Sequence, residues 1–384
     1  MKNTLIAIGA AHALYLMVLV LIKKNKQGPD SILTAYFATF FVTLATAFGA
    51  FAYQMEALLI FHLNISLLLA PLFFLYITAL IQPGRPSGAA RLGHFAAYFL
   101  TWVYWLYLFI ALSGQELDVL FAQTDEALLP VGFSLALLVE SLAIPVYVIW
   151  ALWLLERHRR KIRHTFSFTE GVDLKWARVL TYGIGIFWLG IVVSEALGSG
   201  VKLNSADEDV QHGYALSTFF LYYLGYFGLK QGRLYTDAVP APSEKPSALP
   251  QAAPPPAKYI RSGLKAAEGA AYAETVIDYL KSEKPYLRSR LSIQDLAQAL
   301  EIPAHALSQV INEHLNGSFY DVINRHRVDE FKKRIADPQY QHFTLIAIAL
   351  DCGFNSKSSF NRIFKKYEQR TPTEYVKANR GGGK

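Results

Sequence analysis

The feature that most constrains this chain is a series of seven apolar segments in its first 230 residues. Each segment is near the ~20 residues that a helix needs to cross a bilayer. The segments cover about residues 4–22, 31–53, 57–81, 94–113, 130–155, 177–200 and 213–230. A composition of 53% hydrophobic and only 17% charged residues is unusual for a soluble protein. The sequence therefore predicts a seven-span transmembrane domain over residues 1–233.

The connections between these segments alternate in charge. One set, together with the residues after the last segment, is strongly basic. Its cations are Lys23, Lys24, Lys26, Arg85, Arg91, Arg157, Arg159, Arg160, Lys161, Arg163, Lys175, Lys230 and Arg233. The other set has only Lys2 and Lys202, with acidic runs near residues 116–126 and 207–209. Because basic loops remain in the cytoplasm, we expect a multi-pass protein of a bacterial inner membrane, with its N-terminus outside and its last third inside.

An export signal is the alternative for residues 1–22, because a signal peptide is also a short apolar run after a positive charge. Lys23 and Lys24 follow this run at once. This pair favours retention of that end on the cytoplasmic side. We therefore keep the first segment as a span.

Polar side chains within the spans are costly in lipid, so they are candidates for a functional site. These side chains are His12, His62, Asn64, Glu140, Ser194 and Glu195. The predicted topology places most of them toward the outer side, where they could line a pocket for a small or lipophilic ligand. Hydrogen bonding between helices is the alternative explanation for the same residues.

Residues 236–257 have a different composition, with seven prolines in 22 positions and almost nothing that packs. We predict a Pro/Ala-rich linker over residues 234–262. Proline stiffens such a segment toward an extended form of ~3.1 Å per residue. The linker is therefore able to hold the following domain up to ~70 Å from the membrane.

From Leu264 onward the apolar periodicity is helical. Ser292 and Asp295 form a variant of the capping box at the start of a helix that runs to Leu300. A short turn leads to Pro303, expected at the first position of a second helix, where its missing N–H costs nothing. This is a helix-turn-helix pattern. The outer face of the second helix carries His305, Ser308, Gln309 and Asn312, whose hydrogen-bonding groups suit base edges.

The pattern is repeated nearer the C-terminus. Helices are expected over residues 343–351 and 356–367, around the turn at 352–354. The outer face of the last helix carries Lys357, Ser358, Asn361, Arg362 and Lys365. A helix over residues 318–336 joins the two units and would be ~28 Å long at 1.5 Å per residue. This length would set the two outer faces near one DNA turn apart, ~34 Å.

Residues 272–378 resemble the DNA-binding domains of AraC/XylS-type regulators. The matching positions are Asn324, Arg327, Ile348, Ala349, Gly353, Phe354, Ser358, Phe360, Arg362, Phe364, Lys365, Lys366, Thr371, Pro372 and Tyr375. One departure is Gln369, where the family usually has a glycine that ends the helix.

This resemblance implies separate roles for the polar residues of the two outer faces. The implied base contacts are His305, Ser308, Gln309, Lys357, Ser358, Asn361 and Arg362. The implied phosphate contacts are Asn312, Lys365 and Lys366, which would position the protein without specifying sequence. The alternative for each residue is simple solvation.

The charge balance agrees with a polyanionic partner, since residues 258–384 hold 20 Lys and Arg against 14 Asp and Glu. Cys352 is the only cysteine, so no disulfide can form within the chain, and we expect the thiol to be buried. The sequence has no metal-ligand cluster, phosphate-binding loop or kinase motif that we recognise. We therefore predict no enzyme, no catalytic residue, no metal and no cofactor.

The sequence as a whole predicts an all-α protein. A seven-helix transmembrane sensory bundle at 1–233 would be followed by the linker and by an AraC-type domain at 263–384, with two helix-turn-helix units joined by a long helix. The predicted function is that of a membrane-bound one-component regulator that binds double-stranded promoter DNA, senses a ligand and forms a homodimer. The alternative is a membrane transport or lipid-binding protein with an unrelated basic tail.

Overall fold

The computed structural model describes residues 2–53, 55, 57–82, 92–111, 131–196, 213, 216–230 and 266–380. Within these ranges the chain forms helices and no strand, with one isolated antiparallel bridge between Phe166 and Ser292. The all-α fold class is therefore confirmed. The chain divides into two compact units: Met1–Arg157 with Leu174–Asp237, and His158–Asp173 with Ala238–Lys384. The expected linker at 234–262 lies outside the described residues.

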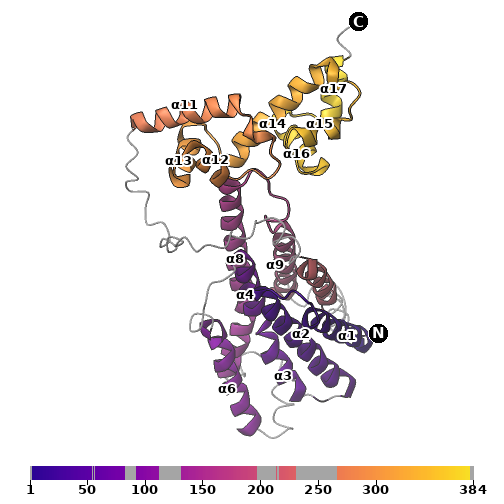
Figure 1. Ribbon diagram of the computed structural model, residues 1–384. Helices are drawn as coiled ribbons and strands as arrows, with labels where there is room; N and C mark the ends of the chain where they lie inside the picture. Colours follow the sequence, from indigo (N-terminus) through magenta and orange to yellow (C-terminus); the bar gives the residue numbers. More distant parts are fainter. Residues whose placement is uncertain are drawn as a thin grey trace. The chain divides into compact units, whose positions relative to one another are not determined.

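The first unit is built from long apolar helices. They are α1 (Lys2–Leu21), α2 (Gly28–Tyr53), α3 (Ala57–Ser66), α4 (Leu69–Ile81), α6 (Ala96–Ala111), most of α8 (Val131–Thr165) and α9 (Lys175–Ala196). A short 3-10 helix, η1 (Gly93–Phe95), precedes α6, and residues 216–230 are also helical. Helix α2 packs against α1, α3 and α4, and α3 packs against α6 (Figure 1).

Four helical stretches are long and apolar enough to cross a membrane. They are Asn3–Leu21, Gly28–Tyr53, Asn64–Ile81 and Val131–Thr165. The remaining three predicted segments correspond to α6, α9 and the helix over 216–230.

The third predicted segment, 57–81, is interrupted. Helix α3 ends at Ser66 and α4 begins at Leu69, with a turn at Leu67 and Leu68. Pro71 has no N–H to bond the carbonyl of Leu67, and its ring crowds that carbonyl. The turn therefore lies where a proline is expected to disrupt a helix.

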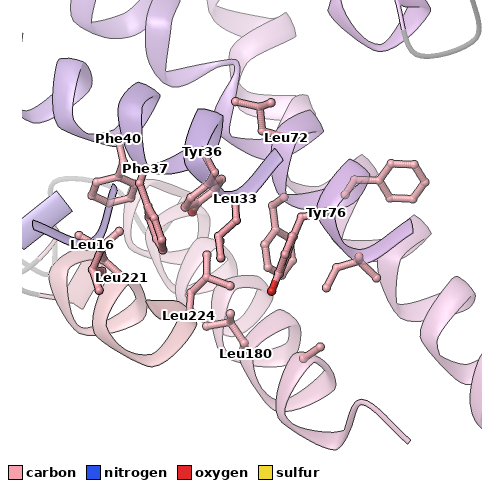
Figure 2. Close-up of a cluster of buried hydrophobic side chains, with 14 of the residues drawn as sticks. Leu16, Leu33, Tyr36, Phe37, Phe40, Leu72, Tyr76, Leu180, Leu221 and Leu224 are labelled. Carbon is pink, nitrogen blue, oxygen red and sulfur yellow. The ribbon is translucent and has the colours of Figure 1, made fainter. Parts of the chain in front are cut away.

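A core of large apolar side chains joins the helices of the first unit. Figure 2 shows Leu16, Leu33, Tyr36, Phe37, Phe40, Leu72, Tyr76, Leu180, Leu221 and Leu224 in this cluster. Gly225 permits a close approach of the helix over 216–230 to α1, because a Cβ atom there would lie 2.6 Å from Leu16 Cδ1. The packing thus brings helices from both ends of the unit together.

The second unit contains shorter helices. They are α11 (Ala266–Ser282), η4 (Pro285–Leu287), α12 (Ile293–Leu300), α13 (Ala304–His314), α14 (Phe319–Ala336), η5 (Pro338–Tyr340), α15 (Leu345–Asp351), α16 (Lys357–Glu368) and α17 (Pro372–Arg380). Helix α14 contributes to two cores. Phe319 and Ile323 pack with α11, α12 and α13, and Phe331 packs with α15 and α16. The long helix therefore joins the two helix-turn-helix units, as the sequence predicts.

Polar caps start these helices. Ser292 Oγ accepts a hydrogen bond from the Asp295 amide while the Asp295 carboxylate accepts one from the Ser292 amide. This confirms the predicted capping box. Ser318, Thr344 and Ser356 cap α14, α15 and α16 with the same spacing of three residues.

Two predicted helix starts differ from the structure. Helix α15, the first helix of the second helix-turn-helix unit, begins at Leu345 and not at Phe343, because Thr344 is its cap, and Phe343 is exposed. Pro303 caps α13 and is not its first helical residue, since its ψ of 133° is still extended.

Candidate nucleic-acid interface

Helix α13 presents the first set of predicted contacts. Leu307, Val310 and Ile311 are buried, which turns the opposite face outward. His305 and Asn312 are exposed, and Ser308 and Gln309 are partly exposed. The Gln309 amide donates to Glu313 Oε1 at 3.1 Å, and Asn312 Nδ2 donates to the Ser308 carbonyl at 2.7 Å. All four predicted residues of this unit therefore lie on one helix face.

Helix α16 presents the second set. Phe360, Ile363 and Phe364 are buried against α14 and α15. The predicted contacts Lys357, Ser358, Asn361, Arg362, Lys365 and Lys366 are all exposed. The face opposite the core is therefore polar and basic, which suits a helix that enters a major groove.

Two cations of α16 bond to residues of α14. Arg362 Nη2 lies 3.2 Å from the Tyr320 hydroxyl, and Lys366 Nζ lies 2.6 Å from Asp321 Oδ1. The Tyr367 hydroxyl also donates to the Asp321 backbone carbonyl at 3.0 Å. The orientation of α16 thus depends on the first turn of α14.

Asp321 is the shared carboxylate of this region. Arg163 Nη2 donates to both of its oxygens, at 2.9 and 3.0 Å, and Lys366 donates to one of them. Burial raises the pKa of Asp321, but hydrogen bonds from Lys366 and Ser318 and the charge of Arg163 lower the pKa overall to about 2. The carboxylate is therefore ionised over the whole physiological range.

Arg327 is the buried centre of the second unit, with 1% of its surface exposed. Its Nε donates to the Tyr286 carbonyl and its Nη2 to the Arg288 carbonyl, each at 2.7 Å. Its Nη1 donates to Asn324 Oδ1 at 3.2 Å. Burial lowers the pKa of the guanidinium to about 10, so the group remains charged near neutral pH. Arg327 therefore positions the loop before α12 and is not available to DNA.

Gly353 brings the turn of the second helix-turn-helix unit against this centre. Its φ of 92° is in the region that favours glycine. A Cβ atom at this position would overlap the Tyr286 carbonyl oxygen and would lie 2.9 Å from Arg327 Nε. The contact requires glycine both for conformation and for space.

Gln369 takes the left-handed conformation at the end of α16 despite having a side chain, with a φ of 57°. Its amide N–H donates to the Lys365 carbonyl, and its side-chain amide donates to the Lys366 carbonyl, each at 3.0 Å. The side chain thus satisfies a helix-end carbonyl, which offsets part of the conformational cost.

Three residues that the sequence analysis did not single out take part in this region: Ser167, Tyr320 and Asp321. Asp321 had a local signal, since it follows the Ser318 cap by three residues. Ser167 had none, because its partners Asn324 and Arg327 are 157 and 160 positions away.

The predicted polar residues of the spans contact neighbouring helices. The His12 ring stacks on Tyr222 with 3.4 Å between centroids. His62 Nδ1 lies 2.9 Å from the Thr43 carbonyl, and Asn64 Nδ2 donates to Thr101 Oγ1 at 3.1 Å. The side chains of Glu140, Ser194 and Glu195 lie outside the described part of the chain. Hydrogen bonding between helices therefore accounts for the contacts of His62 and Asn64.

No group of three His, Cys, Asp or Glu side chains is placed to hold a metal ion within the described ranges. Cys352 is fully buried, and burial raises the pKa of its thiol to about 12. Such a thiol is protonated and shielded from solvent, so it behaves as a small apolar side chain.

Comparison with known proteins agrees with this geometry. Residues 296–378 match the family described as helix-turn-helix domain. The transcriptional regulatory protein HptR of Staphylococcus aureus is 26% identical over 106 residues, which are 28% of this chain and 39% of HptR. An uncharacterized HTH-type transcriptional regulator of the same species, SACOL0084, is 31% identical over 100 residues, which are 26% of this chain and 13% of that protein. The match thus spans less than half the length of these relatives, and no solved structure matches.

The C-terminal part of the chain is therefore a helix-turn-helix domain similar to those of transcription regulators. Such domains bind double-stranded DNA by placing an exposed helix in the major groove. In this chain α13 and α16 are the helices with that exposure, and we refer to them as the reading helices.

Proposed function

We propose that this protein is a membrane-bound one-component transcriptional regulator. Residues 1–233 are its seven-span sensory domain, 234–262 its linker and 263–384 its DNA-binding domain, which lies in the cytoplasm beneath a bacterial inner membrane. The observation that carries the proposal is the joining, in one chain, of a helix-turn-helix domain to helices that are apolar enough to cross a bilayer.

Exposed apolar side chains support the membrane part of the proposal. Leu100, Ile110 and Ile149 are 73%, 75% and 68% exposed on α6 and α8. In water each such side chain forgoes about 1.5–3 kcal/mol that burial would supply. Contact with lipid removes this cost, because lipid chains are as apolar as the side chains themselves.

The reading helices divide the DNA contacts between them. His305, Ser308 and Gln309 of α13 meet bases in one major groove. Lys357, Ser358, Asn361 and Arg362 of α16 meet bases in the next. Asn312, Lys365 and Lys366 contact phosphates.

The ligand site lies among the polar residues of the spans: His12, His62, Asn64, Glu140, Ser194 and Glu195. The ligand is small or lipophilic and enters from the outer side or from the bilayer. The ligand changes the packing of the helices only if it binds one packing arrangement more tightly than another, and the shift is set by that difference in affinity.

Two copies of the chain pair through their membrane helices, and confinement to one plane favours this encounter. Crosslinking in native membranes is expected to recover a dimer at low expression levels. Recovery of monomer alone at every expression level would contradict the pairing.

The orientation of the chain in the membrane follows from the charges of its loops, because basic loops remain in the cytoplasm. A reporter that is active only in the cytoplasm is expected to be active when fused after Arg163 or Gln231, and inactive when fused after Asp125. Cytoplasmic activity after Asp125 would exclude the proposed orientation.

The decisive test of function uses the full chain in lipid nanodiscs. A map of bound chromosomal sites first supplies candidate promoters. Duplexes from those sites are expected to be retarded in a mobility assay, and scrambled duplexes of equal length are not. Loss of this preference in a chain with Asn361→Ala and Arg362→Ala would assign it to α16. A wild-type chain that binds no duplex specifically would favour the alternative of a transport or lipid-binding protein with a basic tail.

A further inference from the structure

Residues 158–173 belong to the same compact unit as the DNA-binding domain. In the sequence they connect the fifth and sixth predicted spans, more than 100 positions before the first helix-turn-helix unit. The Ser167 amide and hydroxyl both donate to the Leu291 carbonyl, at 3.1 and 2.7 Å. The neighbouring Phe166 forms the antiparallel bridge with Ser292. This connection is therefore joined by backbone contacts to the start of α12.

The same connection completes the polar network at the centre of the domain. The Ser167 carbonyl accepts from Asn324 Nδ2 at 3.0 Å and from Arg327 Nη1 at 3.2 Å, and Ser167 Oγ lies 3.1 Å from Arg327 Nη2. All three residues are buried. Because a buried donor without a partner is costly, these contacts make the docked position of Ser167 specific.

The segment has a small core of its own. Ile162, Phe168 and Val172 are buried together. His158 Nε2 lies 2.9 Å from the Val172 carbonyl. The chain thus turns back on the end of α8 as a defined structure, and this geometry presents Arg163 and Thr169 to the DNA-binding domain.

These presented residues reach the second reading helix. Arg163 pairs with Asp321, which also holds Lys366. Thr169 Oγ1 lies 3.4 Å from Arg362 Nη2, the same nitrogen that bonds to the Tyr320 hydroxyl. The Glu170 carboxylate accepts a hydrogen bond from the Thr169 amide at 3.3 Å, so this acid lies beside the residue that contacts Arg362.

We propose that residues 163–170 form a regulatory clasp that competes with DNA for the second reading helix. Docked, the clasp holds Arg362 through Thr169 and brings the Glu170 carboxylate near the surface that phosphates would approach. Released, it frees the Arg362 N–H that Thr169 holds. The inference rests on the proposed function, and it supplies a route for the signal, since α8 runs from the fifth predicted span into the clasp.

The competition follows from the donors of Arg362. A bidentate contact with guanine needs two parallel N–H groups of the guanidinium. Nη2 is already used by Tyr320 and Thr169 in the docked arrangement. A carboxylate beside this group also repels the DNA backbone. The coupling is reciprocal: if bound DNA weakens the docking of the clasp, the docked clasp weakens the binding of DNA by the same factor.

The test fixes the clasp in place with a disulfide. Phe166 and Ser292 are directly opposite in an antiparallel bridge, where Cα atoms are ~4.5–5.5 Å apart, within the range of a disulfide. Full-length protein with Phe166→Cys and Ser292→Cys is prepared in nanodiscs, and Cys352 stays buried and reduced. Oxidation is expected to form the disulfide and to weaken specific DNA binding about tenfold or more, the value of one bidentate contact. Reduction is expected to restore binding.

Each single-cysteine variant is a control, because Ser292 also caps α12. An independent variant, Glu170→Gln, is expected to bind DNA several-fold more tightly than wild type. Its matched control is Glu268→Gln, which removes the same charge from an exposed position on α11. This control is expected to leave DNA binding unchanged.

The outcomes separate the two proposals. Failure of the disulfide to form, or equal DNA binding by the oxidised and reduced proteins, would overturn the clasp while leaving DNA binding intact. Equal effects of Glu170→Gln and Glu268→Gln would also count against it. If neither the reduced protein nor wild type bound any duplex specifically, the proposed function would fail, and the clasp with it.

Discussion

Arg327 donates to both the backbone carbonyl and the hydroxyl of Ser167, at 3.2 and 3.1 Å, across 160 positions of the chain. The pair joins α14 to a connection that the sequence assigns to the membrane half. Its consequence is that the folded DNA-binding unit includes residues far upstream of its first helix. A fragment that starts after the linker would lack Ser167, which accepts two of the hydrogen bonds of its most buried cation.

Arg327→Lys tests this centre. Lysine keeps the charge but cannot reproduce the planar fork that donates to six oxygens of Ser167, Tyr286, Arg288, Ser289 and Asn324. We expect the free energy of unfolding of the second unit to fall by about 3 kcal/mol. Pulse proteolysis of the full chain in nanodiscs measures this loss. Arg325→Lys, on the exposed side of the same helix, should change stability by less than about 0.5 kcal/mol. Equal effects of the two changes would contradict the role of Arg327.

Gly353→Ala tests the close approach of the turn in the second helix-turn-helix unit to Arg327 and Tyr286. The substitution meets both a positive φ and the Tyr286 carbonyl oxygen. We expect a loss of about 2–4 kcal/mol in unfolding free energy. Gly317→Ala is the control, because the nearest atom to a Cβ there is 3.5 Å away. A thermal unfolding scan that shows no difference between the two variants would argue against the close contact.

The lowered pKa of Asp321 predicts that the free energy of unfolding depends on pH in the acid range. Its pKa in the folded protein is about 2, below its ordinary value of 3.8. A depressed carboxylate pKa contributes stability that is fully present above pH 4 and is lost as the pH falls toward 2. The contribution is on the order of 2 kcal/mol. Pepsin, which is active at these pH values, measures it by pulse proteolysis.

The matched control for that experiment is Asp329→Asn. Asp329 is exposed on the same helix, and its Oδ1 lies 3.9 Å from Lys332 Nζ. We expect Asp321→Asn to flatten the stability profile between pH 2 and pH 4, while Asp329→Asn leaves the slope in place. A steep slope that persists in Asp321→Asn would assign the acid sensitivity to another group.

Arg362 and Lys366 separate base reading from phosphate contact. Arg362→Ala should cost about 1–3 kcal/mol of specific affinity and relax the preference at one base pair. Lys366→Ala should weaken the binding of all duplexes alike. It should also reduce the slope of log K against log salt concentration by about 1. Mobility assays over a series of single-base variants and salt concentrations measure both effects. An Arg362→Ala chain with unchanged affinity and preference would show that this face of α16 does not read bases.

Capping residues and apolar periodicity, which act within a few residues, predicted most helices of the second compact unit. Ser292 caps a helix as predicted, because a cap acts on amides only two or three residues away. Ser318 and Ser356, predicted as the first residues of their helices, are the caps one residue before them. The errors at Phe343 and Pro303 are of one or two residues, since capping residues begin a helix without being helical themselves. The apolar periodicity also identified the outer faces of α13 and α16, because it depends on helix geometry alone.

By itself, the sequence determined the all-α class, the apolar helices and the exposed polar faces of α13 and α16, all of which depend on neighbours within a few turns. Only the tertiary structure decided what surrounds those faces. It placed Ser167 on Arg327, Arg163 on Asp321 and Thr169 beside Arg362. Contacts across more than 150 positions leave no periodic trace, because they arise from the packing of whole helices and not from the order of residues along one of them.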